Sequence, residues 1–268
     1  MTVLLHLSDP HFGTERAEVV EALVRLAHEQ RPQVAVLSGD ITQRARRAQF
    51  AAAARFMDRL AVPAMLAIPG NHDIPLFDVM TRLLKPYVAH QQVFGSDLEP
   101  RYVNDELMVL CVNTTRAWRH KDGEVSQRQI ERVARELRAA RPEQLRVVVT
   151  HQPVHVTRQE DEVNLLHGHR EAVRAWAEAG ADVVLGGHIH LPYVRPLAES
   201  VAGLARPMWC AQAGTAVSHR IRGGIPNSVN LLRYDAAQRA PRHCIVERWD
   251  FRGGGFQIES RTQIELAR

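Results

Sequence analysis

Five short clusters of Asp, Asn and His stand out in this chain, and each comes directly after an apolar segment. They read SDPH, SGD, GNHD, THQ and GGHIH. Carboxylate oxygens suit magnesium and manganese, whereas imidazole nitrogens suit zinc and iron. The chemistry that these residue types could do together is therefore the binding of divalent metal ions. The candidate residues are Asp9, His11, Asp40, Asn71, His72, Asp73, His151, His188 and His190.

The spacing within two of the clusters favours joint ligation of one ion. Asp9 and His11 are two residues apart, and so are His188 and His190. In an extended segment this spacing places both side chains on the same side of the backbone. Each pair could then hold one ion from one short piece of chain. Glycine directly precedes three of the clusters and permits a sharp turn there, at Gly39, Gly70 and the pair Gly186–Gly187.

Taken singly, each cluster also has an ordinary structural explanation. Asp9 and Pro10 are typical turn residues. Asp40 or Thr42 could cap a helix, and a lone His151 would more often be structural than a ligand. The ordered set of five favours a functional site, because ligands of open α/β sheets bind beyond the carboxyl ends of the strands.

The elements that must position these clusters alternate between strand and helix over the first 190 residues. Strand patterns cover 2–8, 32–40, 62–73, 107–115, 145–153 and 181–190, and helical spacing covers 15–30, 44–60, 126–140 and 168–179. This alternation predicts βαβ units with mainly parallel pairing. Four successive strand patterns follow residue 200, at 207–217, 228–235, 242–251 and 255–266. We therefore expect antiparallel strands in a β-rich C-terminal part.

These patterns predict a single α/β domain over residues 1–268. We expect a two-sheet β-sandwich flanked by helices, because no Pro-, Gly- or Ser-rich linker divides the chain. Residues 74–100 interrupt the alternation and contain four breaking residues, Pro75, Pro86, Gly95 and Pro100. A long irregular connection of this kind is typical of a functional loop, so we predict that it forms a lid or side wall.

The composition is that of a soluble globular protein, with 45% hydrophobic and 24% charged residues. No apolar run approaches the roughly 20 residues that are needed to cross a bilayer. The N-terminus lacks the charged region and the small-residue cleavage site of a signal peptide. We therefore expect a cytoplasmic protein without a membrane partner.

Neither charge nor cysteine content indicates a different class of site. The formal net charge is +4, with 34 basic and 30 acidic residues that are mixed along most of the predicted helices. Charge alone therefore does not favour nucleic-acid binding. Cys111, Cys210 and Cys244 are far apart in the sequence. We expect them to be small buried side chains rather than disulfides or zinc ligands.

As an ordered set, the five clusters resemble the calcineurin-like metallophosphoesterase superfamily. Its pattern is Asp-x-His, Gly-Asp, Gly-Asn-His-Asp/Glu, His and Gly-His-x-His, which here reads SDPHFG, SGD, PGNHD, VTHQP and GGHIH. These blocks span residues 8–190. Within the superfamily, the segment GDITQRARRAQF and the compact length look most similar to bacterial cyclic-nucleotide and glycerophosphodiester phosphodiesterases. The fold that the resemblance implies is again a β-sandwich with flanking helices.

The resemblance also implies a role for each residue of the set. One metal ion would be held by Asp9, His11 and His190, the other by Asn71, His151 and His188, and Asp40 would bridge them. His72 would be a catalytic histidine that does not bind metal, and Asp73 would orient it. Asp73 stands where many relatives have Glu. The cofactors would be two divalent or trivalent ions, and mixed N and O ligands do not distinguish iron, manganese, zinc and magnesium.

The implied function is hydrolysis of a small or nucleotide-like phosphodiester, including a cyclic nucleotide, by attack of a metal hydroxide. Two metal ions can neutralise charge on the phosphoryl group and lower the pKa of a shared water. A phosphomonoesterase, a nuclease of the same superfamily and a non-catalytic binding scaffold are the alternatives. The segment GDITQRA differs from the protein-phosphatase pattern Gly-Asp-x-Val-Asp-Arg-Gly, and 268 residues leave little room for the extra domain that related nucleases carry.

Several features have no assigned role at this stage. His155, His167 and His169 could line the mouth of a pocket, but surface loop positions explain them as well. His219 could face the site or be structural. Arg44, Arg46 and Arg47 could meet a substrate anion, although a solvated helix start accounts for them. The pattern says little about residues 191–268 or about the oligomeric state.

Overall fold

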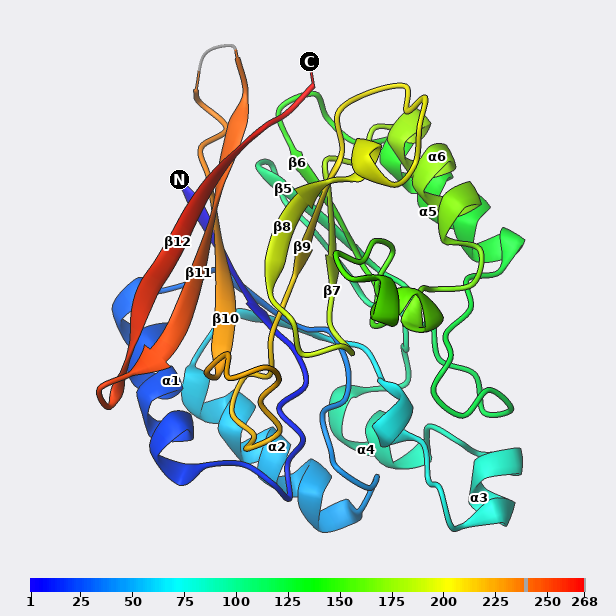
Figure 1. Ribbon diagram of the computed structural model, residues 1–268, viewed down its shortest axis with the longest axis vertical. Helices are drawn as coiled ribbons and strands as arrows, with labels where there is room; N and C mark the ends of the chain where they lie inside the picture. Colours follow the sequence, from blue (N-terminus) through cyan, green and yellow to red (C-terminus); the bar gives the residue numbers. More distant parts are fainter. Residues whose placement is uncertain (239–240, 268) are drawn as a thin grey trace.

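The computed structural model describes residues 1–238 and 241–267. Two six-stranded sheets pack face to face, and helices cover the outer face of each sheet (Figure 1). This architecture is the α/β sandwich with flanking helices that the sequence predicts.

The first sheet has the strand order β12-β11-β10-β1-β2-β3. Its parallel part consists of β1 (Thr2–Leu7), β2 (Val34–Leu37) and β3 (Ala64–Ala67). Its antiparallel part consists of β10 (Ser228–Tyr234), β11 (His243–Arg252) and β12 (Gly255–Glu265), with β10 paired to β1. The predicted β-rich C-terminal part thus extends the sheet that begins at the N-terminus.

The second sheet has the order β4-β5-β6-β7-β9-β8. Four strands pair in parallel, β5 (Leu107–Cys111), β6 (Leu145–Val149), β7 (Val183–Gly186) and β9 (Trp209–Gln212). Two short antiparallel edge strands complete it, β4 (Arg101–Val103) and β8 (Tyr193–Pro196). Parallel pairing in both sheets directs the carboxyl ends of β1, β2, β3, β6 and β7 toward a common rim.

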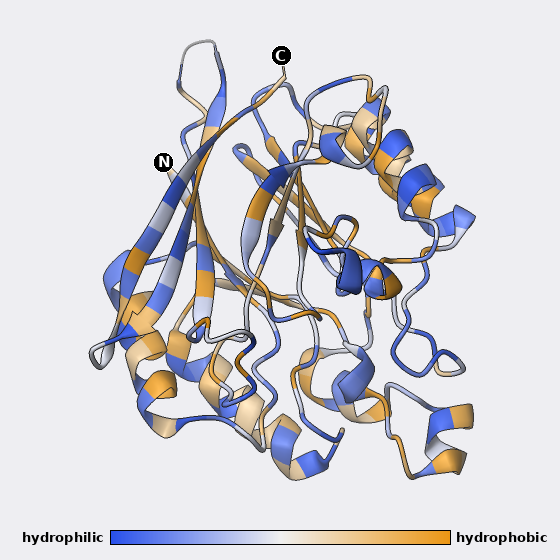
Figure 2. Cartoon of the chain, in the orientation of Figure 1, coloured by the Kyte–Doolittle hydropathy of each residue, from blue (hydrophilic) through white to orange (hydrophobic). Residues whose placement is uncertain are grey.

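The two faces of each sheet are buried against different partners. On β1, Leu5 and Leu7 pack toward the helices α1 (Ala17–Gln30) and α2 (Arg47–Leu60), whereas Leu4 packs into the core between the sheets. Helices α5 (Gln127–Arg138) and α6 (His169–Ala179) cover the second sheet in the same way. Figure 2 shows hydrophobic stripes on these helices. Burial of apolar side chains in these layers is the main favourable contribution to folding.

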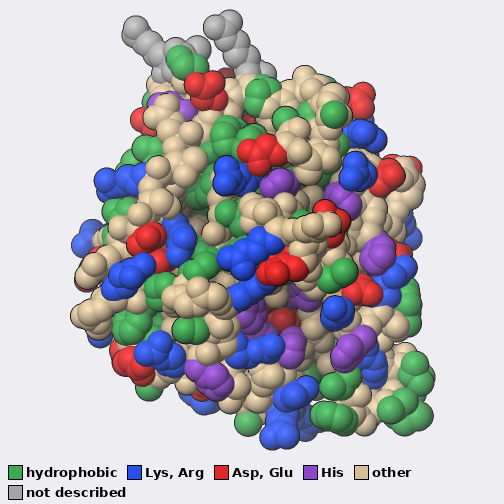
Figure 3. All heavy atoms as spheres, in the orientation of Figure 1, with side chains coloured by type: hydrophobic (Ala, Val, Ile, Leu, Met, Phe, Trp, Pro, Cys, Tyr) green, Lys and Arg blue, Asp and Glu red, His purple; other side chains and the backbone are tan. Residues whose placement is uncertain are grey.

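Residues 74–100 contain two short helices, α3 (Val79–Leu84) and α4 (Val88–Phe94). Helix α4 packs on α2 through His90, whose buried ring lies between Phe50 and Phe94. Helix α3 has no buried residue and exposes Met80 and Leu83. Its apolar side chains gather at the lower right of Figure 3. The remaining elements are short 3-10 helices, η1 (Asn71–Asp73), η2 (Gln159–Asn164) and η3 (Leu197–Glu199).

Among the described residues, no helix combines the length and the apolar character that a transmembrane span requires.

Candidate metal centre

The loops after five strands meet at the rim formed by the two sheets. Backbone hydrogen bonds join them, because the amide of Asp9 donates to the carbonyl of Gly39 (3.1 Å) and that of His11 to Asp40 (3.0 Å). The amide of Gly187 donates to the carbonyl of His151 in the same way (2.9 Å). All nine candidate residues from the sequence come together here, from segments up to 181 positions apart in the chain, taken as 190 − 9.

Five of the predicted ligands have a left-handed backbone. Their φ angles are 51° at Asp9, 43° at His11, 49° at Asp40, 74° at His188 and 55° at His190. The expectation that the two His-containing pairs lie on extended segments is therefore wrong. Non-glycine residues in this region cost roughly 1–3 kcal/mol each and cluster at functional sites. The strained turns place these side chains at the rim just beyond the ends of the strands.

Two glycines let the loops approach each other closely. Gly39 has φ of +103°, and a Cβ there would overlap the ring of His151. A Cβ on Gly187 would overlap Ser8 and the carboxylate of Asp9. Any side chain at these two positions would push the ligand loops apart.

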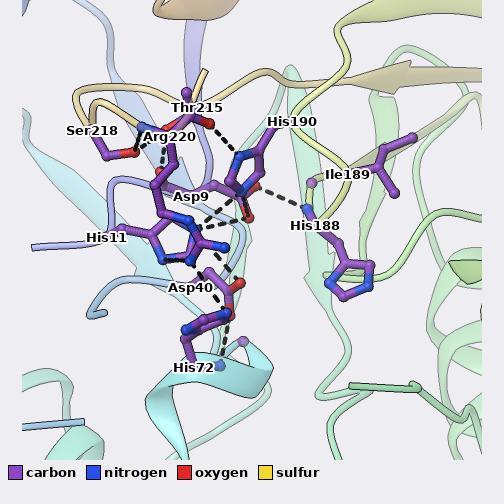
Figure 4. Close-up of polar contacts among 12 residues, drawn as sticks. Asp9, His11, Asp40, His72, His188, Ile189, His190, Thr215, Ser218 and Arg220 are labelled. Carbon is purple, nitrogen blue, oxygen red and sulfur yellow. Dashed lines mark hydrogen bonds and ion pairs between the residues drawn. The ribbon is translucent and has the colours of Figure 1, made fainter. Parts of the chain in front are cut away.

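The first group of potential ligands comprises Asp9, His11 and His190 (Figure 4). His190 Nε2 lies 3.3 Å from Asp9 Oδ1 and 3.0 Å from His11 Nε2. His11 Nε2 also lies 3.7 Å from Asp40 Oδ2. The oxygen and nitrogen atoms thus converge on one point from β1 and β7, which belong to different sheets.

The second group comprises Asp40, His151 and His188, whose ligand atoms lie within 4.8 Å of one another. His151 Nε2 is 3.3 Å from Asp40 Oδ1 and 3.3 Å from Asn71 Oδ1. Asp40 therefore directs one carboxylate oxygen to each group. This is the arrangement that a bridging ligand requires.

Contacts behind the ligands fix the orientation of their rings. His151 Nδ1 bonds to the carbonyl of Ser38 (2.8 Å), and His190 Nδ1 to the carbonyl of Arg220 (2.7 Å). Each Nδ1 is therefore the donor to its carbonyl, and each Nε2 is the ring atom that faces the cluster. Hydrogen bonds of this type orient metal-binding imidazoles in many proteins.

Two buried polar atoms in the cluster lack a hydrogen-bond partner within the described chain, Asp9 Oδ1 and His188 Nδ1. An unpaired buried polar atom costs free energy unless something else satisfies it. Both atoms belong to the potential ligand groups. The donor set of carboxylate, amide and imidazole therefore fits the metal ions that the sequence pattern implies.

Burial and mutual charge shift the ionisation of these groups strongly. Burial alone would raise the pKa of Asp40, but the neighbouring His151 and His72 rings bring it well below its usual value. Burial lowers the pKa of His11 to about 3 and that of His188 to about 4. Burial acts to lower the pKa of His151, but the charges of Asp40 and Asp9 and the hydrogen bonds to Asp40 and Ser38 together raise it to about 9. A metal ion would displace the proton from His151, since imidazole binds metals in its neutral form.

The structure changes the interpretation of Asp73. Its buried carboxylate accepts hydrogen bonds from the amides of Gly70 (2.9 Å), Ile41 (2.9 Å) and Thr42 (2.8 Å). The ring of His72 is held elsewhere, with Nδ1 bonded to the carbonyl of Gln43 (2.9 Å). The expectation that Asp73 orients His72 is therefore wrong at the level of direct contact. Asp73 instead ties the Asp40 loop to the turn that carries His72.

Arg220 is a site residue that the sequence did not indicate. It lies in the connection between β9 and β10, and its Nη1 is 3.3 Å from His72 Nε2 and 3.0 Å from Gln43 Oε1 (Figure 4). No ion-pair contact with a carboxylate is found for it among the described residues. Arg220 follows the last recognisable cluster by 30 positions, 220 − 190. The segment before it is tied to the loop after β1, where the amide of Ala216 donates to the carbonyl of Ser8 (2.9 Å) and that of His219 to Thr14 (3.0 Å), and these contacts bring the arginine to the rim.

A cleft of about 690 Å³ opens above the cluster and is lined by Asp40, Asn71, His72, His188 and His190. Arg220, Ile221 and Asn164 form part of its wall. Figure 3 shows His and acidic side chains in this hollow with Lys and Arg side chains around it. The histidines without an assigned role do not line the cleft, namely His155, His167, His169 and His219.

A second cavity of about 230 Å³, here called the side hollow, adjoins the cleft. Asn71, His72 and Lys121 line both cavities. The side hollow is also lined by Leu76 and Arg82, which come from the segment predicted to be a lid or side wall.

Comparisons with known proteins identify the family of the chain and its fold. The family model of the calcineurin-like phosphoesterases matches residues 2–192, so the chain belongs to that family. The family uses dinuclear metal centres. No curated protein sequence matches the chain.

Solved structures show the same fold at low sequence identity. A purple acid phosphatase from yellow lupin (Lupinus luteus) seeds superimposes with a TM-score of 0.73 at 11% identity. The match covers 98% of this chain but 53% of the lupin chain, so this protein spans about half the length of that relative. A dimetal phosphatase from Danio rerio has a TM-score of 0.65 at 14% identity, with 99% of both chains covered. These likenesses establish the fold alone.

Proposed function

We propose that the protein is a dinuclear metal-dependent phosphodiesterase that hydrolyses a small or nucleotide-like ester. The observation that carries this proposal is the meeting of two cavities at the candidate metal centre. The cleft and the side hollow share Asn71 and His72 in their walls. A phosphodiester has two substituents on phosphorus, whereas a monoester has one. Two cavities that diverge from one reactive point suit the diester.

In this proposal, each metal ion takes ligands that follow strands of both sheets. Asp9, His11 and His190 would hold one ion, Asn71, His151 and His188 the other, and Asp40 both. When bound, two such ions neutralise charge on the phosphoryl oxygens and provide an activated water nucleophile. The buried, hydrogen-bonded rings of His151 and His190 would keep the ligand geometry fixed through turnover.

His72 is assigned the proton transfer to the leaving oxygen. Its Nδ1–H donates to the carbonyl of Gln43, so Nε2 is the atom directed to the cavities. Histidine is the side chain that most often transfers protons in catalysis. Asp40 Oδ1 accepts a hydrogen bond from the backbone amide of His72 (2.8 Å), which keeps the ring next to the reactive point.

In the same proposal, Arg220 binds a phosphoryl oxygen of the substrate. Its guanidinium lies beside His72 and is restrained by Gln43 Oε1 rather than by a carboxylate. A guanidinium in that state retains its full charge for a substrate anion. Because its backbone carbonyl also holds His190, the same residue links substrate binding to the ligand set.

A hydrolysis panel with defined metals tests the proposal. Protein reconstituted with manganese, iron, zinc or magnesium should be assayed against bis(p-nitrophenyl) phosphate, p-nitrophenyl phosphate, a cyclic nucleotide and single-stranded DNA. The proposal predicts faster hydrolysis of a small diester than of the monoester. A preference for p-nitrophenyl phosphate would assign the protein to the phosphomonoesterases, and a preference for DNA would assign it to the nucleases.

A further inference from the structure

The side hollow differs from the cleft in size and in charge. Its volume is about 230 Å³, which is below the range of about 300–1,000 Å³ that is common for sites of drug-sized ligands. Such a cavity suits one small group rather than a drug-sized ligand. It opens directly beside His72, so a group bound there would remain attached to the ester at the candidate metal centre.

The charged side chains that line the side hollow are all basic, namely Arg44, Arg82, Lys121 and the titratable His120. No carboxylate is among its lining residues. Arg82 donates to the carbonyl of Pro75 (3.3 Å), and Arg44 lies over the ring of Phe77 (5.9 Å). Within the described chain, Arg44, Arg82 and Lys121 make no ion pair with Asp or Glu. Their charges are therefore not offset locally.

The wall of the cleft is balanced by comparison. Glu160 and Asp161 line it, and Arg222 pairs with both, at 3.0 Å and 2.8 Å. Apart from Arg220, which faces His72 from the cleft, the unpaired cations around the reactive point thus line the side hollow. Converging cations without acidic partners are the typical arrangement for a phosphate or carboxylate site.

We propose that the side hollow binds a second anionic group of the substrate, a phosphate or carboxylate carried on one substituent of the scissile phosphodiester. This inference rests on the proposed phosphodiesterase function and specifies its substrate class. Arg82 and Arg44 would contact the oxyanion with their guanidinium groups, and Lys121 would contact it as a point charge from the boundary with the cleft. Uncharged substituents would gain nothing from this flank.

A matched pair of chromogenic esters tests the inference. Thymidine 5′-(p-nitrophenyl phosphate) and its 3′-phosphorylated analogue differ by one phosphate. A charged hydrogen-bonding contact typically changes binding by about tenfold or more, so kcat/KM should be at least about tenfold higher for the analogue. The p-nitrophenyl phosphodiester of 3-hydroxypropanoate, compared with that of its amide, distinguishes carboxylate from phosphate recognition.

The variants Arg82→Gln and Lys121→Gln should each weaken this preference, and the double variant should abolish it. Arg138→Gln, an exposed arginine on α5, is the matched control. Equal kcat/KM for both members of both pairs in the unmodified enzyme would overturn the inference. A preference that survives the double substitution would overturn it too.

Calorimetry on the metal-loaded protein separates this inference from the proposed function. Thymidine 3′,5′-bisphosphate should bind at least about tenfold more tightly than thymidine 5′-monophosphate, and the double variant should lose that difference. Calorimetry with 3-hydroxypropyl phosphate and 2-carboxyethyl phosphate provides the matching carboxylate arm. If no diester is hydrolysed but either difference is found, the phosphodiesterase proposal fails and the anion site stands. Equal affinities within both ligand pairs would overturn the anion site whether or not diesters are hydrolysed.

Discussion

The candidate metal centre and the side hollow lie next to each other but are built in opposite ways. Asp9, His11 and His151 are completely buried and follow central strands, and backbone hydrogen bonds join their loops. Arg44 and Lys121 of the side hollow are exposed and lie on irregular segments. The reactive part is thus fixed by both sheets, whereas the part that would choose the substrate lies on loops. Loops on a rigid scaffold commonly carry specificity in this way.

The largest expected effect comes from Asp40→Ala, because one side chain serves both ligand groups. We expect the variant to lose at least about 100-fold in metal affinity, since even contacts one step removed from a metal typically cost 10- to 100-fold. Esterase activity should fall with it. Elemental analysis after dialysis measures the effect, with Asp58→Ala, an exposed carboxylate on α2, as control. Retention of both ions would contradict the bridging role.

The next largest effect is expected for His72→Ala, a variant that distinguishes a loss of proton transfer from a loss of metal binding. His72→Ala should lower kcat by roughly 100- to 10,000-fold, the usual range for removal of a general acid. Metal content should stay within error of the unmodified protein. The ring of His72 also lies near His11 and Asp40, so loss of one ion in this variant would instead make His72 a ligand. His28→Ala, on the exposed side of α1, is the control.

Asp73→Ala tests whether the candidate metal centre contributes more to stability than segment 74–100, which carries α3 and α4. The substitution leaves three buried amide groups without an acceptor, those of Gly70, Ile41 and Thr42. Each such group costs about 1–3 kcal/mol. The exposed cap Asp78→Ala on α3 should cost about 1 kcal/mol. Thermal unfolding of the two variants gives the comparison, and an equal shift in Tm would contradict the assigned role of Asp73.

The smallest expected effect is on the stability of the protein in acid. It comes from His90, which anchors segment 74–100 on α2. Burial lowers the pKa of His90 on α4 to about 4, from its ordinary value of 6.5. Below pH 6.5 the unfolded chain takes up a proton that the folded chain does not, so stability falls as the pH drops from 6.5 toward 4.

His90→Phe should remove this contribution, which amounts to about 1.4 kcal/mol for each unit of pKa difference. Urea unfolding of both proteins at pH 7 and pH 5 measures it. The stability difference between variant and unmodified protein should move in favour of the variant at pH 5. A difference that does not change with pH would show that His90 is not kept neutral by the fold.

Most of the fold could be predicted, because the strands near the centre are short, fully apolar and followed by turn residues. The edge strands β4 and β8 and the helices α3 and α4 were not predicted. Apart from the buried His90, their residues are half-buried or exposed, and they show no clear periodicity. Local pattern carries little information where tertiary contacts decide the conformation.

The candidate site divides in the same way. The residues that converge at the rim could be selected because each follows a strand. Their left-handed backbone could not be foreseen, since only the surrounding loops stabilise it. The contact of Gln43 with His72 uses a backbone carbonyl, which any residue could supply. Arg220 and the side hollow depend on segments that become neighbours only when the two sheets have formed.

The count of metal ions per chain tests the central claim most directly. The claim is that ligand groups from both sheets, joined by Asp40, form one dinuclear centre. Metal-free protein should be titrated with manganese by calorimetry, and the bound ion should then be quantified by elemental analysis. The account predicts two ions per chain in the unmodified protein. Saturation at one ion per chain, or no tight binding, would contradict it.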